Sequence, residues 1–331
     1  MKVPGRIVAG ALFALLLCAP LVFDRYWVDV LNSIGLYAIL GLSLNIILGY
    51  AGMFHMGHAA FYAIGAYATA ILNTSYGVPV LWTLPVSGLA AALFALLVAR
   101  PIIHLRGDYL LIVTIGMVEI VRIALINDVF GITGGANGIF GIDRPQLFGF
   151  KIRQPQHFFY LIWLFAGLTI LLFSLLENSR FGRALNYLRE DEVAAEGSGI
   201  NTAAYKLAAF VLGAGWAGMA GTIFAAKMTI ISPESFSFWE SVVLFMIVIL
   251  GGAGNIAGVI LGAFLVVGLP EVFRDFASAR MLFYGLAMMF MMIYRTQGIL
   301  PPRPRIYRLD RAGGESCPCS VSTTSPSVSA A

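Results

Sequence analysis

The sequence predicts an all-α, polytopic membrane protein of about ten transmembrane helices, some of them interrupted at Gly-rich breaks. Hydrophobic residues make up 59% of the 331 residues, 11% are charged, and the mean hydropathy is +0.86. Several apolar runs approach the roughly 20 residues that a helix needs to cross a bilayer. The net charge of +4 comes mostly from loop Arg residues, and no basic patch with interleaved aromatics appears. This distribution fits a membrane protein and indicates no nucleic-acid partner.

Ten apolar segments are candidate membrane spans. They cover residues 7–23, 30–50, 59–75, 80–99, 108–126, 157–176, 205–226, 238–250, 256–273 and 281–294. The first follows Lys2 and Arg6 as the core of a signal peptide would, but its apolar run continues to Phe23 without a clean small-residue cleavage site. We therefore expect it to be retained as a span.

Two Gly-rich segments are expected to interrupt the helices. The third span follows a short Gly-rich stretch between Tyr50 and Ala59, which predicts a broken or re-entrant start. The eighth is short for a crossing and runs into Gly251-Gly252-Ala253-Gly254. Such breaks are tolerated at membrane depth only where protein or a water-filled cavity covers them. Because one lies in each half of the chain, they hint at an internal repeat with a solute route between the halves.

The distribution of Lys and Arg predicts a cytoplasmic N-terminus. In that orientation thirteen of the 21 basic residues lie inside and seven outside, which satisfies the positive-inside rule. An even number of spans places the C-terminus inside too. We expect a transmembrane domain of residues 1–302, and a disordered cytoplasmic tail of residues 303–331 because that segment is rich in Ser, Pro and Gly.

Residues 177–201, ENSRFGRALNYLREDEVAAEGSGIN, form a polar island with eight charged residues between two apolar stretches. Phe181, Leu185 and Leu188 fall on one face of a helix, which we expect around residues 183–196. Gly199 is expected to end it at positive φ. From the pattern alone, the island is either an amphipathic docking surface for a soluble partner or a plain connecting loop.

Glu119 and Arg122 are the strongly charged pair well inside a predicted span. Their i, i+3 spacing lets them neutralise each other, since an unpaired charge at this depth costs several kcal/mol. The pair is either a polar wall or gate of a pathway, or an ion pair that locks two helices. The scarcity of other buried carboxylates argues against a proton-driven carrier.

No pattern indicates an enzyme, a cofactor or a metal site. His55 and His58 lack a third ligand nearby, so we expect hydrogen bonds from their rings to neighbouring backbone carbonyls instead. The glycines of residues 251–258 lack the Gly-Lys-Ser/Thr ending of a nucleotide-binding P-loop. No Ser/His/Asp or Cys/His constellation is present, so any energy from ATP must come from separate subunits.

Five collinear blocks resemble the permease subunits of branched-chain amino acid ABC importers, and the M-type subunit more than its H-type partner. The blocks are GLSLNIILGYAGMFHMGHAAFYAIGAYATAIL (41–72), RGDYLLIVTIGMVEIVR (106–122), TGGANGIFGI (133–142), RFGRALNYLREDEVAAEGSGIN (180–201) and ISPESFSFWESVVLFMIVILGGAGNIAGVILGA (231–263). They cover most of the chain up to about Arg295. One departure is Met53-Phe54-His55-Met56 ahead of Gly57-His58, where the family usually has a Gln and a Ser-Leu stretch.

The resemblance implies a non-enzymatic, multi-pass subunit in the bacterial inner membrane that translocates Leu, Ile or Val. Its implied partners are an H-type permease, two cytoplasmic ABC ATPase subunits and a periplasmic solute-binding protein. Residues 177–203 would couple to the ATPase, through Arg180, Phe181, Arg183, Leu188, Arg189, Glu192, Ala195, Glu196 and Gly199. Pathway or gate candidates are Asn45, Gly52, His55, His58, Glu119, Arg122, Gly252 and Gly254. A urea or short-chain amide importer is the nearest alternative, followed by a stand-alone secondary transporter.

Overall fold

The computed structural model describes residues 20, 23–105, 107–128, 131–147, 150–152, 154–272, 285, 286, 289, 293 and 298–300. The predicted first and tenth spans lie largely outside these residues, and the predicted tail lies wholly outside them.

Helices account for the predicted spans from 30–50 to 256–273, so the all-α prediction is confirmed. The long helices and their extensions are α3 (Arg25–Asn45) with the π-helix η1 (Ile46–Tyr50), α4 (His58–Tyr76), α5 (Val80–Ile102), α6 (Asp108–Ile126), α7 (Pro155–Asn178), α10 (Thr202–Met228), α11 (Phe238–Gly251) and α12 (Ile256–Ala263) with η4 (Phe264–Gly268) and α13 (Leu269–Val272). Two short helices, α8 (Arg180–Glu190) and α9 (Glu192–Gly197), form the polar island. The 3-10 turns are η2 (Gly135–Asn137) and η3 (Pro233–Phe236).

Six helical segments of the described chain are long and apolar enough to cross a membrane. They are Arg25–Tyr50, Val80–Ile102, Asp108–Ile126, Pro155–Asn178, Thr202–Met228 and Pro233–Gly251. Although α4 has 19 residues, it is not among them. Most of its side chains are buried against protein, so this helix does not need the apolar outer face that lipid demands.

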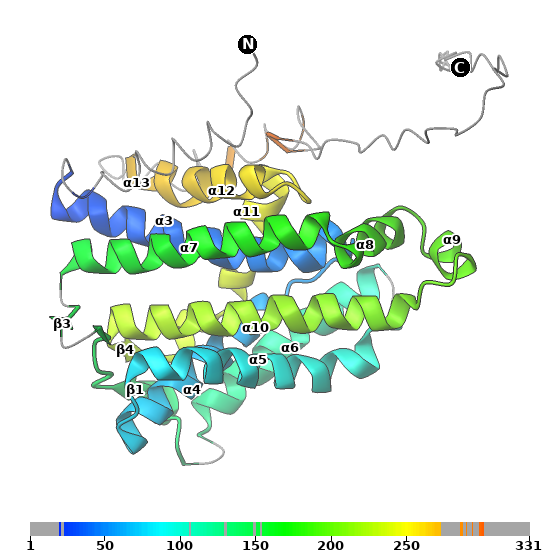
Figure 1. The fold of residues 1–331 in the computed structure, drawn as a ribbon. Helices are drawn as coiled ribbons and strands as arrows, with labels where there is room; N and C mark the ends of the chain where they lie inside the picture. The colour runs from blue at the N-terminus through cyan, green and yellow to red at the C-terminus, as the bar shows by residue number, and fades with distance from the viewer. Residues whose placement is uncertain are drawn as a thin grey trace, which may run out of the picture.

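The long helices run side by side, and their connections gather at two ends (Figure 1). At one end lie α8 and α9. At the other lie the short strands β1 (Ile139–Phe140) and β4 (Ile230–Ile231), an antiparallel pair, and the two-residue hairpin of β2 (Gln146–Leu147) and β3 (Phe150–Lys151). The alternation of the predicted inside and outside loops is therefore reproduced in space.

Helix α10 is the centre of the packing, because it lies against α5, α4 and α3. Small residues permit this approach: a Cβ added at Gly65 of α4 would lie 2.2 Å from the carbonyl oxygen of Gly218 on α10. The hydroxyls of Thr69 on α4 and Thr222 on α10 form a hydrogen bond across the same contact, with 2.8 Å between their Oγ1 atoms. Helices α3, α4, α5 and α10 thus form one tightly packed block.

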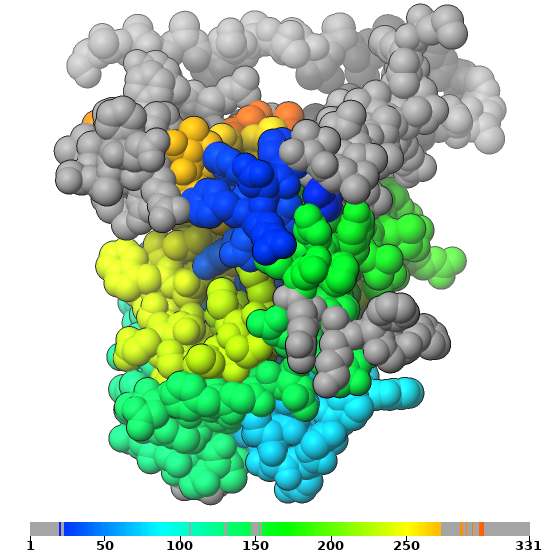
Figure 2. Space-filling view, turned by 90° about the vertical axis from the view of Figure 1, so that its left-hand side faces the viewer, coloured from blue at the N-terminus to red at the C-terminus, as the bar shows by residue number. Residues whose placement is uncertain are grey.

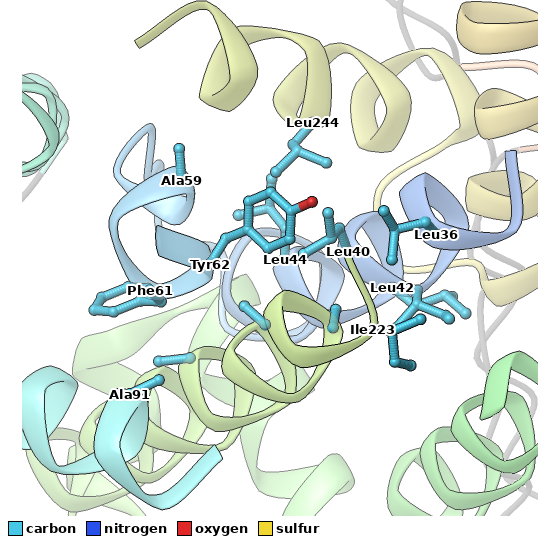
Figure 3. Close-up of a cluster of buried hydrophobic side chains, with 14 of the residues drawn as sticks. Leu36, Leu40, Leu42, Leu44, Ala59, Phe61, Tyr62, Ala91, Ile223 and Leu244 are labelled. Atoms are coloured by element: carbon cyan, nitrogen blue, oxygen red, sulfur yellow. The ribbon is translucent and has the colours of Figure 1, made fainter. Parts of the chain in front are cut away.

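The apolar core surrounds α3 (Figure 3). Its leucines Leu36, Leu40 and Leu44 belong to one buried cluster with Phe61 and Tyr62 of α4, Ile223 of α10 and Leu244 of α11. The outer surface is also apolar: α5 exposes Trp82 and Leu97, and α7 exposes Leu164. An apolar exterior around an apolar core is the pattern of a helix bundle in lipid.

Candidate coupling segment and pathway residues

The polar island folds as two helices, so the single helix predicted around residues 183–196 is wrong. Asp191 adopts an extended conformation (φ −152°, ψ 111°) that ends α8. Its Oδ1 accepts hydrogen bonds from the backbone N–H groups of Val193 (2.9 Å) and Ala194 (3.1 Å) and so caps α9. Ser179 caps α8 in the same way, accepting from the Gly182 N–H at 3.2 Å.

The predicted apolar face of the island is confirmed. Leu185 and Leu188 are buried, and the ring of Phe181 stacks on Tyr205 of α10 with 5.5 Å between centroids. Ala195 of α9 is buried as well. These four side chains hold the island against the membrane helices, so they position the segment and leave other side chains to face outward.

Two predicted coupling carboxylates also bond to α10. Glu192 Oε1 lies 2.6 Å from the ammonium of Lys206, whose side chain is buried, and Glu196 Oε1 accepts from the Thr202 hydroxyl at 2.8 Å. Lys206 was not among the residues predicted for this segment. A cation one turn inside an apolar run, 14 residues after an acidic cluster, was the signal that could have identified it.

The outward surface of the island carries Arg180 together with two apolar side chains that the sequence analysis missed. Tyr187 is 50% exposed and Val193 is 68% exposed. Both lie off the buried apolar face, and that position was the available signal. Arg183 donates from Nη1 to the Asn178 carbonyl at 3.1 Å. Gly199 has φ +82°, which confirms the predicted left-handed conformation, and nothing lies within 4 Å of a Cβ built there.

The two Gly-rich breaks meet at a point that we call the Gly49 junction, formed by Asn45, Gly49, Arg189 and Gly254. Asn45 is buried, and its Oδ1 accepts from the backbone N–H of Gly254 at 2.8 Å. Arg189 Nη1 donates to the carbonyl of Gly49 at 2.6 Å. The junction joins the π-helical end of α3, the break after α11 and helix α8.

Positive φ marks both breaks. Gly52 (φ +68°) starts the non-helical segment 51–57, and a Cβ there would lie 3.0 Å from Arg189 Cγ. Gly252 (φ +113°) and Gly254 (φ +92°) end α11, and the N–H groups of Ile299 and Leu300 donate to the carbonyls of Leu250 and Gly251. The predicted broken helices are therefore confirmed at both places.

The hydrogen bonds predicted for the two histidines are wrong. His58 Nε2 lies 2.7 Å from the hydroxyl of Ser43, which also lies 2.7 Å from the Leu40 carbonyl, so the ring pairs with a side-chain hydroxyl and not with a backbone carbonyl. His55 is fully buried, and neither ring nitrogen has a hydrogen-bond partner among the described residues. Its ring packs against Phe61 and Phe210. No group of three metal-ligating side chains occurs in the described part of the chain.

Glu119 and Arg122 form the predicted ion pair on α6, with 2.9 Å between Glu119 Oε2 and Arg122 Nε. A third member was missed: Glu234 of η3, whose Oε1 lies 3.0 Å from Arg122 Nη1. We call these residues the α6 triad. Its net charge is −1, and the Glu234 side chain is 72% exposed. The bond between Arg122 and Glu234 thus ties α6 to the turn before α11, and the exposed Glu234 carboxylate faces outward.

A further carboxylate within a span, Glu240 of α11, was also missed. Its Oε2 accepts from the Tyr37 hydroxyl at 2.8 Å. Its place at the third residue of the predicted eighth span was the signal. Carboxylates within the spans are therefore less scarce than the sequence suggested, which weakens the case against a proton-driven carrier.

Comparison with known proteins gives a consistent family. Residues 26–294 match the family described as branched-chain amino acid transport system / permease component. The high-affinity branched-chain amino acid transport system permease protein LivM of Escherichia coli is 42% identical, over 92% of this chain and 77% of its own length. A probable LivM of Methanocaldococcus jannaschii is 26% identical, over 84% and 95%. LivH of Escherichia coli is 27% identical, over 71% and 80%. No solved structure matches significantly. The chain therefore belongs to the family of branched-chain amino acid transport system permease components.

Proposed function

We propose that this chain is one of two permease subunits of an ABC importer for leucine, isoleucine and valine. The observation that carries the proposal is the α8–α9 island, a charged and partly apolar outer surface at one end of a membrane helix bundle. The described residues form no nucleotide-binding loop, so a surface of this kind serves to receive an ATPase from outside the chain.

The island would lie in the cytoplasm and dock the ATPase through its outward side chains. Arg180, Tyr187 and Val193 are exposed, whereas Leu188 and Ala195 are buried and hold the surface in place. Tyrosine and arginine are enriched in protein interfaces, so the pairing of Tyr187 with Arg180 on this surface suits a docking role. Gly199 would set the direction in which the chain returns to α10, because its left-handed conformation ends the segment.

The second permease would cover α6. Two members of the α6 triad lie on the spanning helix α6, and the third, Glu234 of η3, brings the net charge to −1; charged groups at such a place are costly unless protein or water covers them. This side of α6 would therefore face protein or the aqueous solute route. Similarity to LivH supports a pair of related subunits, since homologous chains can build one pathway across a pseudo-two-fold axis.

The opposite end would face a periplasmic solute-binding protein. It is seen face-on in Figure 2, where the segment after α6, the end of α10 and the starts of α3 and α7 form the surface. The binding protein would select the amino acid and release it toward the α6 triad.

The experiment is a pair of substitutions at Val193 in the complete transporter. Val193→Asp places a charge on the proposed docking surface, and Val193→Thr is the control of matching shape. We expect Val193→Asp to insert normally, to lose ATPase on co-purification and to abolish leucine uptake, whereas Val193→Thr does neither. Normal ATPase binding and uptake by Val193→Asp would contradict the docking surface. Labelling of Ser198→Cys by an impermeant reagent in intact cells would contradict the orientation.

A further inference from the structure

Arg189 of α8 is exposed as a whole, but its guanidinium reaches the end of another helix and caps it. Its Nη1 donates to the carbonyl of Gly49, at 2.6 Å, in the last turn of the π-helix η1. Carbonyls in the last turn of a helix have no partner further along it, and a cation there also favours the helix dipole. The backbone and Cγ of Arg189 lie beside Gly52 as well, within 3.0–3.5 Å of a Cβ built there.

The same point contacts the second broken helix. A Cβ built on Gly49 would lie 2.0 Å from Asn45 Oδ1 and 2.5 Å from the nitrogen of Gly254. Asn45 Oδ1 in turn accepts from that nitrogen at 2.8 Å. The end of η1 and the break at Gly254 thus meet with no room for one methyl group, and Arg189 of α8 lies beside them at Gly52, so a displacement of one segment presses on its neighbours.

We propose that Arg189 transmits motion rather than docking the ATPase: it ties α8 to the broken end of α3 and, through Asn45, to the break between α11 and α12. The inference rests on the proposed function, because the ATPase is what would displace α8. Broken helices lack a continuous hydrogen-bond ladder and bend at the break, so they are where a displacement at the surface is converted into opening of the pathway.

The strength of the link comes from its chemistry. A hydrogen bond from a guanidinium is roughly twice as strong as one between neutral groups. Tyr50, next to the junction, donates its hydroxyl to Glu177 Oε2 at 3.4 Å, so the end of η1 is also tied to the end of α7. Arg189 is therefore a positioning residue, and its loss separates ATP hydrolysis from transport without removing the docking surface.

The test uses the complete transporter in proteoliposomes, with ATPase co-purification, ATP hydrolysis and leucine uptake measured together. We expect Arg189→Ala to keep its ATPase and to hydrolyse ATP, while the ATP consumed per leucine rises about tenfold or more, the factor given by losing one hydrogen bond to a charged group. In Arg189→Lys the ATP consumed per leucine should rise less than in Arg189→Ala, because an ammonium can still donate to the Gly49 carbonyl. Arg100→Ala removes the same charge from an exposed site at the end of α5 and should leave the ratio unchanged.

Two results would overturn the inference. An unchanged ratio in Arg189→Ala would show that the junction transmits nothing. Loss of ATPase from Arg189→Ala, with retention in Arg189→Lys, would make Arg189 a docking residue. Both differ from failure of the proposed function, in which the unmodified chain itself would not co-purify with an ATPase.

Discussion

Replacing Gly49 with alanine should destabilise the protein more than any comparable substitution in its exposed helices. The added Cβ would lie 2.0 Å from Asn45 Oδ1 and 2.5 Å from the nitrogen of Gly254, so both groups must shift. Overpacking of this kind costs about 1–3 kcal/mol. Breaking the part-buried Asn45–Gly254 hydrogen bond leaves the buried Asn45 side-chain carbonyl without this partner, at about 1–3 kcal/mol more. We expect a loss of about 2–6 kcal/mol in the free energy of unfolding.

Gly116→Ala is the matched control, because a Cβ on this α6 residue meets nothing within 4 Å. Alanine there should stabilise the helix by about 0.5–1 kcal/mol. Unfolding in mixed SDS and mild-detergent micelles measures both. The double variant Asn45→Ala/Gly49→Ala should lose less unfolding free energy than the two single variants lose together, because the two changes share one contact. A free energy of unfolding for Gly49→Ala within about 0.5 kcal/mol of the unmodified protein would refute the steric clash at Gly49.

Three further predictions concern groups outside the junction. Glu192→Ala strips the buried Lys206 ammonium of its carboxylate and should cost about 2–4 kcal/mol of unfolding free energy, most of it recovered by adding Lys206→Met; no recovery would argue against the pair. Gly199→Ala should cost about 1–2 kcal/mol and Gly199→Asn less, because asparagine tolerates the left-handed region; equal costs would contradict the φ argument. Hydrogen bonds from the Thr133 N–H and hydroxyl hold the pKa of the Asp128 carboxyl below its ordinary value, so its stabilisation is complete above about pH 4 and is lost as pH falls through the lowered pKa. Asp128→Asn should therefore flatten the acid side of the stability profile, and an unchanged profile would refute this.

Features set by local periodicity could be predicted from the sequence. The face of Phe181 and Leu185 follows from helical spacing, and the pairing of Glu119 with Arg122 follows from neighbouring turns of one helix. Gly199 was predictable because few other residues adopt its conformation.

Features that depend on distant segments could not be predicted. The bond between Asn45 and Gly254 joins residues 209 positions apart, and no periodicity reports it. The contact of Glu234 with Arg122 depends on how η3 folds back against α6. The division of the island at Asp191 was missed because an aspartate among charges resembles a surface residue until its carboxylate is seen to cap the next helix.

The exposed surfaces of the helices differ in a way that bears on assembly. Helices α5 and α7 present large apolar side chains such as Leu97 and Leu164, which suit lipid. Helix α6 presents apolar side chains too, but Glu119 and Arg122 flank them and the carboxylate of Glu234 stands open beside them. A charge cluster of this kind, shared between α6 and η3 on an otherwise apolar exterior, is costly unless protein or water covers it. The side of α6 is therefore the surface on which we propose that a second permease subunit lies, because it would enclose those charges along a solute route.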